Sequence, residues 1–327
     1  MFHRLSRRLL LAVSLLCSLS GFAAAQNWPD RPVRVLVGFA AGGNIDILAR
    51  MTAQRLTDAL GQQFVVENRV GGNGALAAEA VARATPDGYT LLWAGTGSIS
   101  IFPALTKTPF DPLKDFAPVS VIGQSPQVLI VNDKVPAKTV QEFVAHVKAQ
   151  REPLSYGGGG GPGSVSYLLM ALFLKRAGLE MTNVSYRGTA PAMTDVIAGH
   201  IPTMFIPLSE AMPQARSGKI RMLAVSSGTR SRQAPDVPTV AESGYPGYNA
   251  SSWTGLLAPV GTPKTIIDKM AAEFARAVKD PKFVEQLDTH GVEPLGLSPD
   301  EFGKFLADDI ALWAEAVKIA GVSLQPR

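Results

Sequence analysis

The stretch VRVLVGFAAGGNIDILAR, residues 33–50, leads from an apolar run into a helical pattern through two adjacent glycines. Residues 33–37 are rich in valine, which predicts a buried strand. A helix is expected over 45–60, followed by Gly61 as a C-terminal stop. Its predicted buried face consists of Leu48, Thr52, Leu56 and Leu60. No catalytic side chain follows the strand, so the glycines favour a loop that binds an anion through backbone N–H groups.

The same alternation of strand and helix continues along the chain, and it predicts an α/β fold with a largely parallel sheet. Further strands are expected at 64–67, 89–94, 127–132, 183–188, 203–207 and 220–227. Further helices are expected near 74–84, 138–150, 165–177, 190–198, 264–279, 281–289 and 299–319. A chain of 327 residues with 46% hydrophobic residues can bury the cores of two such units.

Four loops rich in glycine, serine or threonine lie at strand-to-helix junctions, namely 40–44, 95–100, 157–164 and 187–191. In an α/β sheet such loops gather at the carboxyl ends of the strands, where ligands bind. Glycine admits a ligand to the backbone, and a helix start favours an anion. The segment GGGGGPG at 157–163 can also be interpreted as a flexible linker. We favour a strand-to-helix loop because an apolar helix pattern follows at once.

Asp46 falls in the first turn of the helix predicted over 45–60. An acidic residue there stabilises the helix dipole, which is one sufficient reason for its presence. In direct contact with a ligand it would repel a carboxylate. A supporting role, in which its side chain fixes the loop by accepting backbone N–H bonds, fits both a structural and a binding function.

The first 25 residues have the pattern of a signal peptide. Arg4, Arg7 and Arg8 precede an apolar run, and three alanines at 23–25 supply a cleavage site before Gln26. The run is shorter than the roughly 20 residues that span a bilayer, so a retained anchor is disfavoured. Twin-arginine and general export both stay open. The pattern therefore predicts a periplasmic protein.

Removal of the leader leaves 28 basic and 27 acidic residues, and it removes the one cysteine, Cys17. The near-neutral balance argues against a nucleic-acid partner. Without cysteine, the exported chain has no disulfide, thiolate metal site or cysteine nucleophile. The histidines outside the leader, His146, His200 and His290, stand apart and lack metal-site spacing. We therefore expect no enzyme activity, no catalytic residues, no metal and no cofactor.

A G-x-G-x-x-A pattern at 72–77 is a weak dinucleotide fingerprint. Polar residues separate it from the preceding strand, and no acidic residue follows at the required distance. We therefore do not assign a nicotinamide site.

Several segments together resemble the substrate-binding receptors of tripartite tricarboxylate transporters, also called the Bug family. The segments with that resemblance are WPDRPVRVLVGFAAGGNIDILAR (28–50), VVENRVGGNG, PDGYTLL, DPLKDFAPVSVI, YRGTAPAMTDVIAG, GKIRMLAVSS, PDVPTVAESG and WTGLLAPVGTP. They occur in the expected order over nearly the whole exported chain. The PDGYTL and KDFAP segments are rather specific.

The resemblance implies a two-lobed periplasmic binding protein of type II-like architecture, with two crossing segments and a ligand cleft between the lobes. Lobe 1 would hold residues 26–122 and 250–327, and lobe 2 would hold 123–249. The ligand carboxylate would be held mainly by backbone amides and waters. The candidate ligand-binding residues are Ala41, Gly42, Gly43, Asp46, Thr96, Ser98, Gly160, Ser164, Gly188, Thr189 and Pro207.

The chain departs from the family pattern in the loop that should bind the carboxylate. Ala41 replaces a proline and Ile45 replaces a hydroxyl residue, while Tyr167 stands where a histidine is common. Such changes free the unbound loop and remove polar contacts, so the sequence leaves the ligand's identity and affinity open.

The predicted function is capture of a small organic carboxylate for delivery to membrane transporter subunits, by a receptor that is expected to be monomeric. The alternative is a ligand-dependent partner of a membrane sensor kinase. Trp253, near the return crossing, is expected either to report closure of the cleft or to pack at the hinge.

Overall fold

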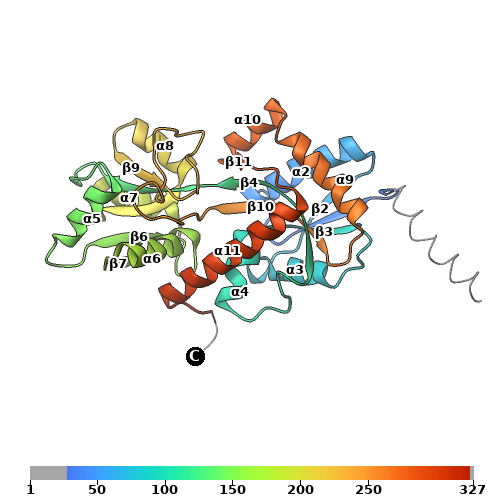
Figure 1. The fold of residues 1–327 in the computed structure, drawn as a ribbon, viewed down its shortest axis with the longest axis horizontal. Coiled ribbons are helices and arrows are strands. Elements are labelled where there is room, and N and C mark those ends of the chain that lie inside the picture. Colours follow the sequence, from blue (N-terminus) through green and yellow to red (C-terminus); the bar gives the residue numbers. More distant parts are fainter. Residues whose placement is uncertain (1–27, 325–327) are drawn as a thin grey trace, which may run out of the picture.

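The computed structural model describes residues 28–324 of the chain. The predicted signal peptide, 1–25, lies outside the described residues. Figure 1 shows two lobes, each built on its own sheet, with two strands and a long helix passing between them. The two-lobed α/β fold expected from the sequence is confirmed.

The sheet of the first lobe has six strands in the order β11-β4-β10-β3-β1-β2. The strands are β1 (Val33–Val37), β2 (Phe64–Asn68), β3 (Thr90–Gly95), β4 (Phe116–Ser125), β10 (Ser252–Pro259) and β11 (Glu293–Pro294). Its helices are α2 (Asn44–Leu60), α3 (Ala75–Ala82), α4 (Phe102–Leu105), α9 (Lys264–Ala277) and α10 (Pro281–Thr289). Two short turns, η1 (Gly72–Gly74) and η2 (Gly97–Ile101), follow β2 and β3.

The sheet of the second lobe has five strands in the order β7-β6-β8-β5-β9. The strands are β5 (Gln127–Asn132), β6 (Ser155–Gly159), β7 (Thr182–Tyr186), β8 (Thr203–Pro207) and β9 (Ile220–Val225). Its helices are α5 (Val140–Lys148), α6 (Val165–Ala177), α7 (Thr189–Ala198) and α8 (Leu208–Arg216). The residue boundaries of the two lobes stay a prediction.

The last helix, α11 (Pro299–Ala320), joins the cores of both lobes. Near its start, Phe302 and Leu306 pack with first-lobe residues such as Leu36. Near its end, Trp313 and Val317 pack in a cluster with residues of α6 in the second lobe. The helix thus contacts the two lobes alongside the crossing strands β4 and β10, as Figure 1 shows.

The expectation of largely parallel sheets is wrong, because both sheets are mixed. The strand pairs β1–β2, β1–β3, β6–β7 and β6–β8 are parallel, whereas β10 is antiparallel to β3 and β4, and β5 is antiparallel to β8 and β9. The strands β5 and β10 enter their lobes from the crossing segments and do not follow a helix of the same lobe. A parallel pair needs a crossover connection, usually a helix, so these two strands can pair antiparallel. The alternation of patterns carries no information on these directions.

The segment 157–163 is not a linker, since its first three residues belong to β6. A Cβ atom at Gly159 would lie 3.1 Å from the Cα of Thr189, and one at Gly157 would lie 2.8 Å from Ile201. Close approach of the start of α7 and of the Ile201 side chain therefore favours glycine here. The preferred interpretation, a strand that runs into a helix, is confirmed.

Candidate functional site

The loop between β1 and α2 is shaped by Gly42 and Asp46. Gly42 has φ +81°, a left-handed conformation that favours glycine. Its backbone N–H donates to Asp46 Oδ2 at 2.9 Å. Asp46 therefore makes the loop-fixing contact considered from the sequence. The same bond occupies the Gly42 N–H, which is then not offered to a ligand in this conformation.

Two further side chains fix Asp46. Arg50 Nε donates to Asp46 Oδ2 at 2.9 Å, and Asn68 Nδ2 donates to Oδ1 at 2.8 Å. Asn68 also donates to the carbonyl of Phe39 at 2.9 Å, which ties the end of β2 to the loop after β1. Burial opposes ionisation of Asp46, yet the hydrogen bonds from Arg50, Gly42 and Asn68 prevail and lower its pKa. The loop is thus held by an ionised, buried carboxylate.

The first turn of α2 carries backbone donors without a side-chain cap. Gly43 is the N-cap residue, with extended dihedrals of −74° and 161°, and it has no side chain to accept from the helix. The first bond within the helix runs from the N–H of Ile47 to the carbonyl of Gly43. The N–H groups of Asn44 and Ile45 precede it and so have no acceptor within the helix. This helix start is suited to bind an anion.

Asn44 and Ile45 line a cavity of about 260 Å³ that includes residues of both lobes. The crossing strands contribute Ser125, Ser252, Trp253 and Thr254, and the second lobe contributes Gln127, Pro207, Ser209 and Glu210. Leu48, His290 and Gly291 complete the lining. The crossing and second-lobe walls include serine, threonine, glutamine and glutamate residues beside Trp253 and Pro207. The start of α2 therefore opens into a space between the lobes whose lining is partly polar and partly apolar.

A second cavity, of about 320 Å³, lies among the strand-end loops of both lobes. Phe39, Asn73 and Gly97 line it from the first lobe, and residues 162–165 with Gly160 line it from the second. Ser164 is the N-cap of α6, where its Oγ accepts from the N–H of Tyr167 at 3.4 Å and donates to the carbonyl of Gly159 at 2.7 Å. The start of α6 is therefore capped by its own side chain.

At the start of α7, the hydroxyl of Thr189 is engaged by an acidic residue. Thr189 Oγ1 donates to Glu210 Oε2 at 2.7 Å. Gly188, the N-cap, is extended, with φ 177°, and a Cβ atom there would meet nothing within 4 Å. The second lobe thus presents a carboxylate beside Thr189, a residue predicted to face the ligand.

Thr96 and Ser98 are buried, and their hydroxyls form hydrogen bonds within the first-lobe scaffold. Thr96 Oγ1 accepts from the backbone N–H of Trp253 on β10 at 2.8 Å, and Ser98 Oγ donates to the carbonyl of Gly95 at 3.1 Å. The indole of Trp253 packs edge-on against Phe302 at 5.2 Å. Of the two roles considered for Trp253, hinge packing matches these contacts, and the reporter role stays a prediction.

The centre of α11 is bound to the return crossing through Asp309. Its carboxylate accepts from the indole of Trp253 at 2.7 Å, from the indole of Trp313 at 2.9 Å and from the hydroxyl of Ser100 at 2.5 Å. Burial raises the pKa of Asp309 to about 6, against the lowering effect of these three donors. The contacts tie η2, β10 and α11 together where the lobes meet.

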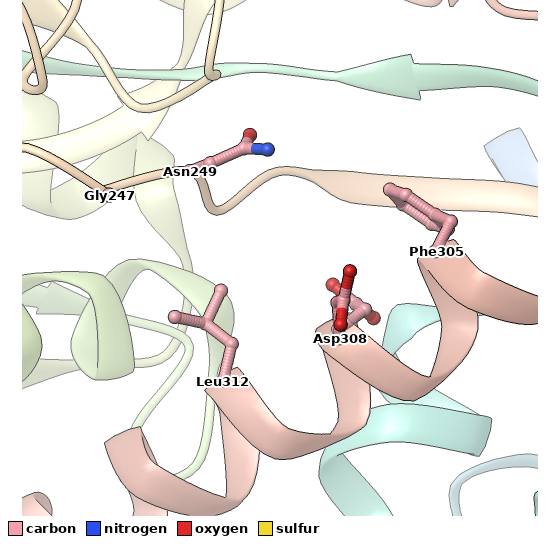
Figure 2. Close-up of a pocket in the computed structure, with 6 residues that line it drawn as sticks. Gly247, Asn249, Phe305, Asp308 and Leu312 are labelled. Atoms are coloured by element: carbon pink, nitrogen blue, oxygen red, sulfur yellow. The ribbon is translucent and has the colours of Figure 1, made fainter.

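A third cavity, of about 260 Å³, lies between α11 and the segment that precedes β10. Figure 2 shows Phe305, Asp308 and Leu312 rising from α11 toward Asn249. None of the residues predicted to bind the ligand lines it.

The structure therefore divides the predicted residues. Gly160, Ser164 and Pro207 line the two interlobe cavities, whereas Ala41, Gly42 and Gly43 lie directly before the helix start that opens into one of them. Sequence reasoning missed Asn44, Asn68 and Glu210. Asn44 adjoins the predicted glycines, but nothing in the sequence pairs Asn68 with Asp46.

Over residues 28–324, no group of three or more His, Cys, Asp or Glu side chains is arranged to hold a metal ion. In the same range, no helix is both long and apolar enough to cross a bilayer.

A two-lobed fold with glycine-rich strand ends around an interlobe cavity is the architecture of a periplasmic solute-binding protein. Residues 48–322 match the model of the tripartite tricarboxylate transporter family receptor, TctC. The chain belongs to this family, which confirms the resemblance seen in the sequence.

Three solved structures are similar over most of their length. Rpa4515 of Rhodopseudomonas palustris, solved with adipate, is 35% identical, with 90% of this chain and 99% of that chain covered and a TM-score of 0.70. MatC from Rhodopseudomonas palustris, with bound malate, is 34% identical, with 89% and 100% covered and a TM-score of 0.66. A TctC solute-binding protein from Polaromonas, without ligand, is 28% identical, with 89% and 99% covered and a TM-score of 0.82.

Proposed function

We propose that this chain is a periplasmic receptor that captures a small organic carboxylate between its lobes and delivers it to a tripartite tricarboxylate-type membrane transporter. The observation that carries the proposal is the uncapped start of α2, which opens into a cavity lined by both lobes. Backbone donors at a helix start bind a carboxylate without a cationic side chain. The family membership supplies the transporter as the partner.

The ligands of the related proteins support a carboxylate. Adipate and malate, found in two relatives, both carry two carboxylate groups. The chain also superimposes better on the ligand-free Polaromonas protein than on these two, although its sequence identity to that protein is lower. The better superposition on the ligand-free protein supports lobes that stand in a ligand-free arrangement and close when a ligand binds.

In this proposal the carboxylate lies against the N–H groups of Asn44 and Ile45, and the preceding glycines leave room for its approach. Asp46 acts as a positioning residue through the N–H of Gly42. The other candidates around the ligand are Ala41, Gly160, Ser164, Gly188, Thr189 and Pro207. Thr96 and Ser98, whose buried hydroxyls bond to the scaffold, are proposed to position the neighbouring loop.

A thermal-shift screen of residues 26–327 tests capture. A panel of mono-, di- and tricarboxylates, amino acids, neutral sugars and nucleotides is added, and a ligand that binds only the folded state must raise the melting temperature. We expect a rise with carboxylates and none with sugars. A panel in which no carboxylate shifts the melting temperature would contradict the proposal.

Co-purification tests delivery. Detergent-solubilised membrane subunits of a tripartite tricarboxylate transporter are mixed with the receptor and the carboxylate that shifted its melting temperature. Ligand-dependent capture of these subunits is expected. A parallel mixture contains a detergent-solubilised sensor kinase, and ligand-dependent capture of the kinase without capture of the transporter subunits would favour the alternative function.

A further inference from the structure

The charges around the interlobe cavities are unevenly distributed. Among the described residues that line the two cavities, Glu210 is the only Asp, Glu, Lys or Arg side chain. Arg187 precedes Gly188 in the chain but lines neither cavity. The first lobe offers the positive end of α2, and the second lobe offers a carboxylate. The space is therefore polarised from one lobe to the other.

Glu210 retains the capacity to accept further hydrogen bonds. Its Oε2 accepts from Thr189, and an ionised carboxylate has about four acceptor sites. Glu210 lies in the first turn of α8, a helix that begins directly after Pro207 at the end of β8. It lines the same cavity as Asn44. A second ligand carboxylate placed beside it would meet a like charge, and no Lys or Arg side chain among the described lining residues offsets that charge.

Gln127 adds an unpaired acceptor to the same cavity wall. The residue is 4% exposed and lines the cavity that includes Glu210. Its Oε1 has no hydrogen-bond partner among residues 28–324. A buried acceptor without a partner is costly, and a donor group on a bound ligand would satisfy it. The terminal torsion of glutamine is broad, so the amide can turn toward such a group.

From this polarity we infer that the ligand is an amino carboxylate, whose carboxylate binds at the start of α2 and whose ammonium group binds Glu210 with support from Gln127. The inference rests on the proposed function and narrows its ligand class. Glu210 is then a specificity-determining residue, which favours an ammonium group over a second carboxylate at the far end. A charge-assisted hydrogen bond of this kind corresponds to a preference of about tenfold or more.

Ligands of one chain length that end in a carboxylate, an ammonium or a methyl group distinguish the effect of each terminal charge on affinity. Titration calorimetry compares adipate, 6-aminohexanoate and hexanoate, which share one chain length, and then succinate, 4-aminobutyrate and butyrate. The wild-type protein is compared with Glu210→Gln. The control is Glu180→Gln, which removes the same charge from an exposed position of the second lobe that lines none of the three cavities.

We expect the wild-type protein to bind the amino member of a series at least tenfold more tightly than the dicarboxylate. Glu210→Gln should remove that preference, and Glu180→Gln should keep it. Tighter binding of a dicarboxylate by the wild-type protein, or an amine preference that survives in Glu210→Gln, overturns the inference and leaves carboxylate capture standing. Absence of binding for all six compounds also overturns it. Only a failed carboxylate panel in the thermal-shift screen removes the proposed function itself.

Discussion

The helices α2 and α6 both begin after a glycine-rich loop at the end of a strand, yet their first turns differ. Ser164 caps α6 with its own hydroxyl, which accepts from the N–H of Tyr167. Gly43 leaves α2 without a cap, and the acidic side chain in the first turn of α2 bonds back to the N–H of Gly42. One loop thus satisfies its helix start internally, and the other leaves donors facing a cavity.

The difference shows that glycine content alone does not mark an anion site. The residue at the N-cap decides whether the first-turn donors are already bonded. A support that holds the loop without using those donors completes the site. In α2 this support is Asp46, with Arg50 and Asn68 around it.

The largest expected effect on stability follows from removing that support. Asp46→Ala eliminates acceptors for Gly42, Arg50 and Asn68, and it should lower the free energy of unfolding by about 2 kcal/mol. Urea unfolding of wild type and variant measures it. Because the loop would lose its fixed conformation, carboxylate affinity should fall as well. Full affinity in the variant would show that the loop is positioned by other contacts.

The same carboxylate predicts an acid dependence. The pKa of Asp46 is lowered in the folded protein, so its contribution is complete above the unfolded value of 3.8 and is lost as the pH falls below it. Asp46→Asn should flatten the loss of stability below about pH 4. Urea midpoints between pH 3 and 7 test this, and parallel curves for the two proteins would contradict it.

A smaller effect is expected at the capped helix. Ser164→Ala should cost about 1 kcal/mol, as loss of a helix N-cap does. Differential scanning calorimetry should show a melting temperature lower by about 2 °C for a protein of this size. Carboxylate affinity should change less than tenfold. A large loss of affinity at an unchanged melting temperature would mean that the hydroxyl serves the ligand rather than the helix.

The smallest effect is expected at Gly188. Its extended backbone and the open space around it should limit the cost of Gly188→Ala to about 0.5 kcal/mol. Gly42→Ala, with φ +81°, should cost about 1 kcal/mol or more. Chemical denaturation of the pair measures the contrast. Equal costs would indicate that the loop after β1 relaxes to a conformation open to alanine.

The sequence predicted the alternating elements and most of their bounds, because periodicity and cap residues are local signals. The helix expected over 45–60 is found over Asn44–Leu60, and the one expected over 165–177 is found over Val165–Ala177. Helix α8 was missed, since Pro213 inside it disfavours a helix by local rules.

For the candidate site, the sequence placed the glycine loops at strand ends but could not place their long-range contacts. The bonds of Asn68 to Asp46 and of Thr189 to Glu210 join residues 22 and 21 positions apart, and no spacing rule connects them. Glu210 was missed together with the helix that carries it. The hydrogen bond from the N–H of Gly42 to Asp46 likewise emerges only from the fold. Because this bond occupies the Gly42 N–H, the proposed carboxylate contact lies at Asn44 and Ile45 instead.

The most direct test of carboxylate binding at the start of α2 places a competing carboxylate there. The dihedrals of Gly43 suit a capping residue, so the side chain of Gly43→Asp can accept from the first-turn N–H groups. Titration calorimetry with the carboxylate selected by the thermal-shift screen compares this variant with wild type and with Gly43→Ala. We predict at least a hundredfold weaker binding for Gly43→Asp, or about 2.7 kcal/mol, and near wild-type binding for Gly43→Ala. Unchanged affinity in a folded Gly43→Asp protein would show that the carboxylate binds elsewhere.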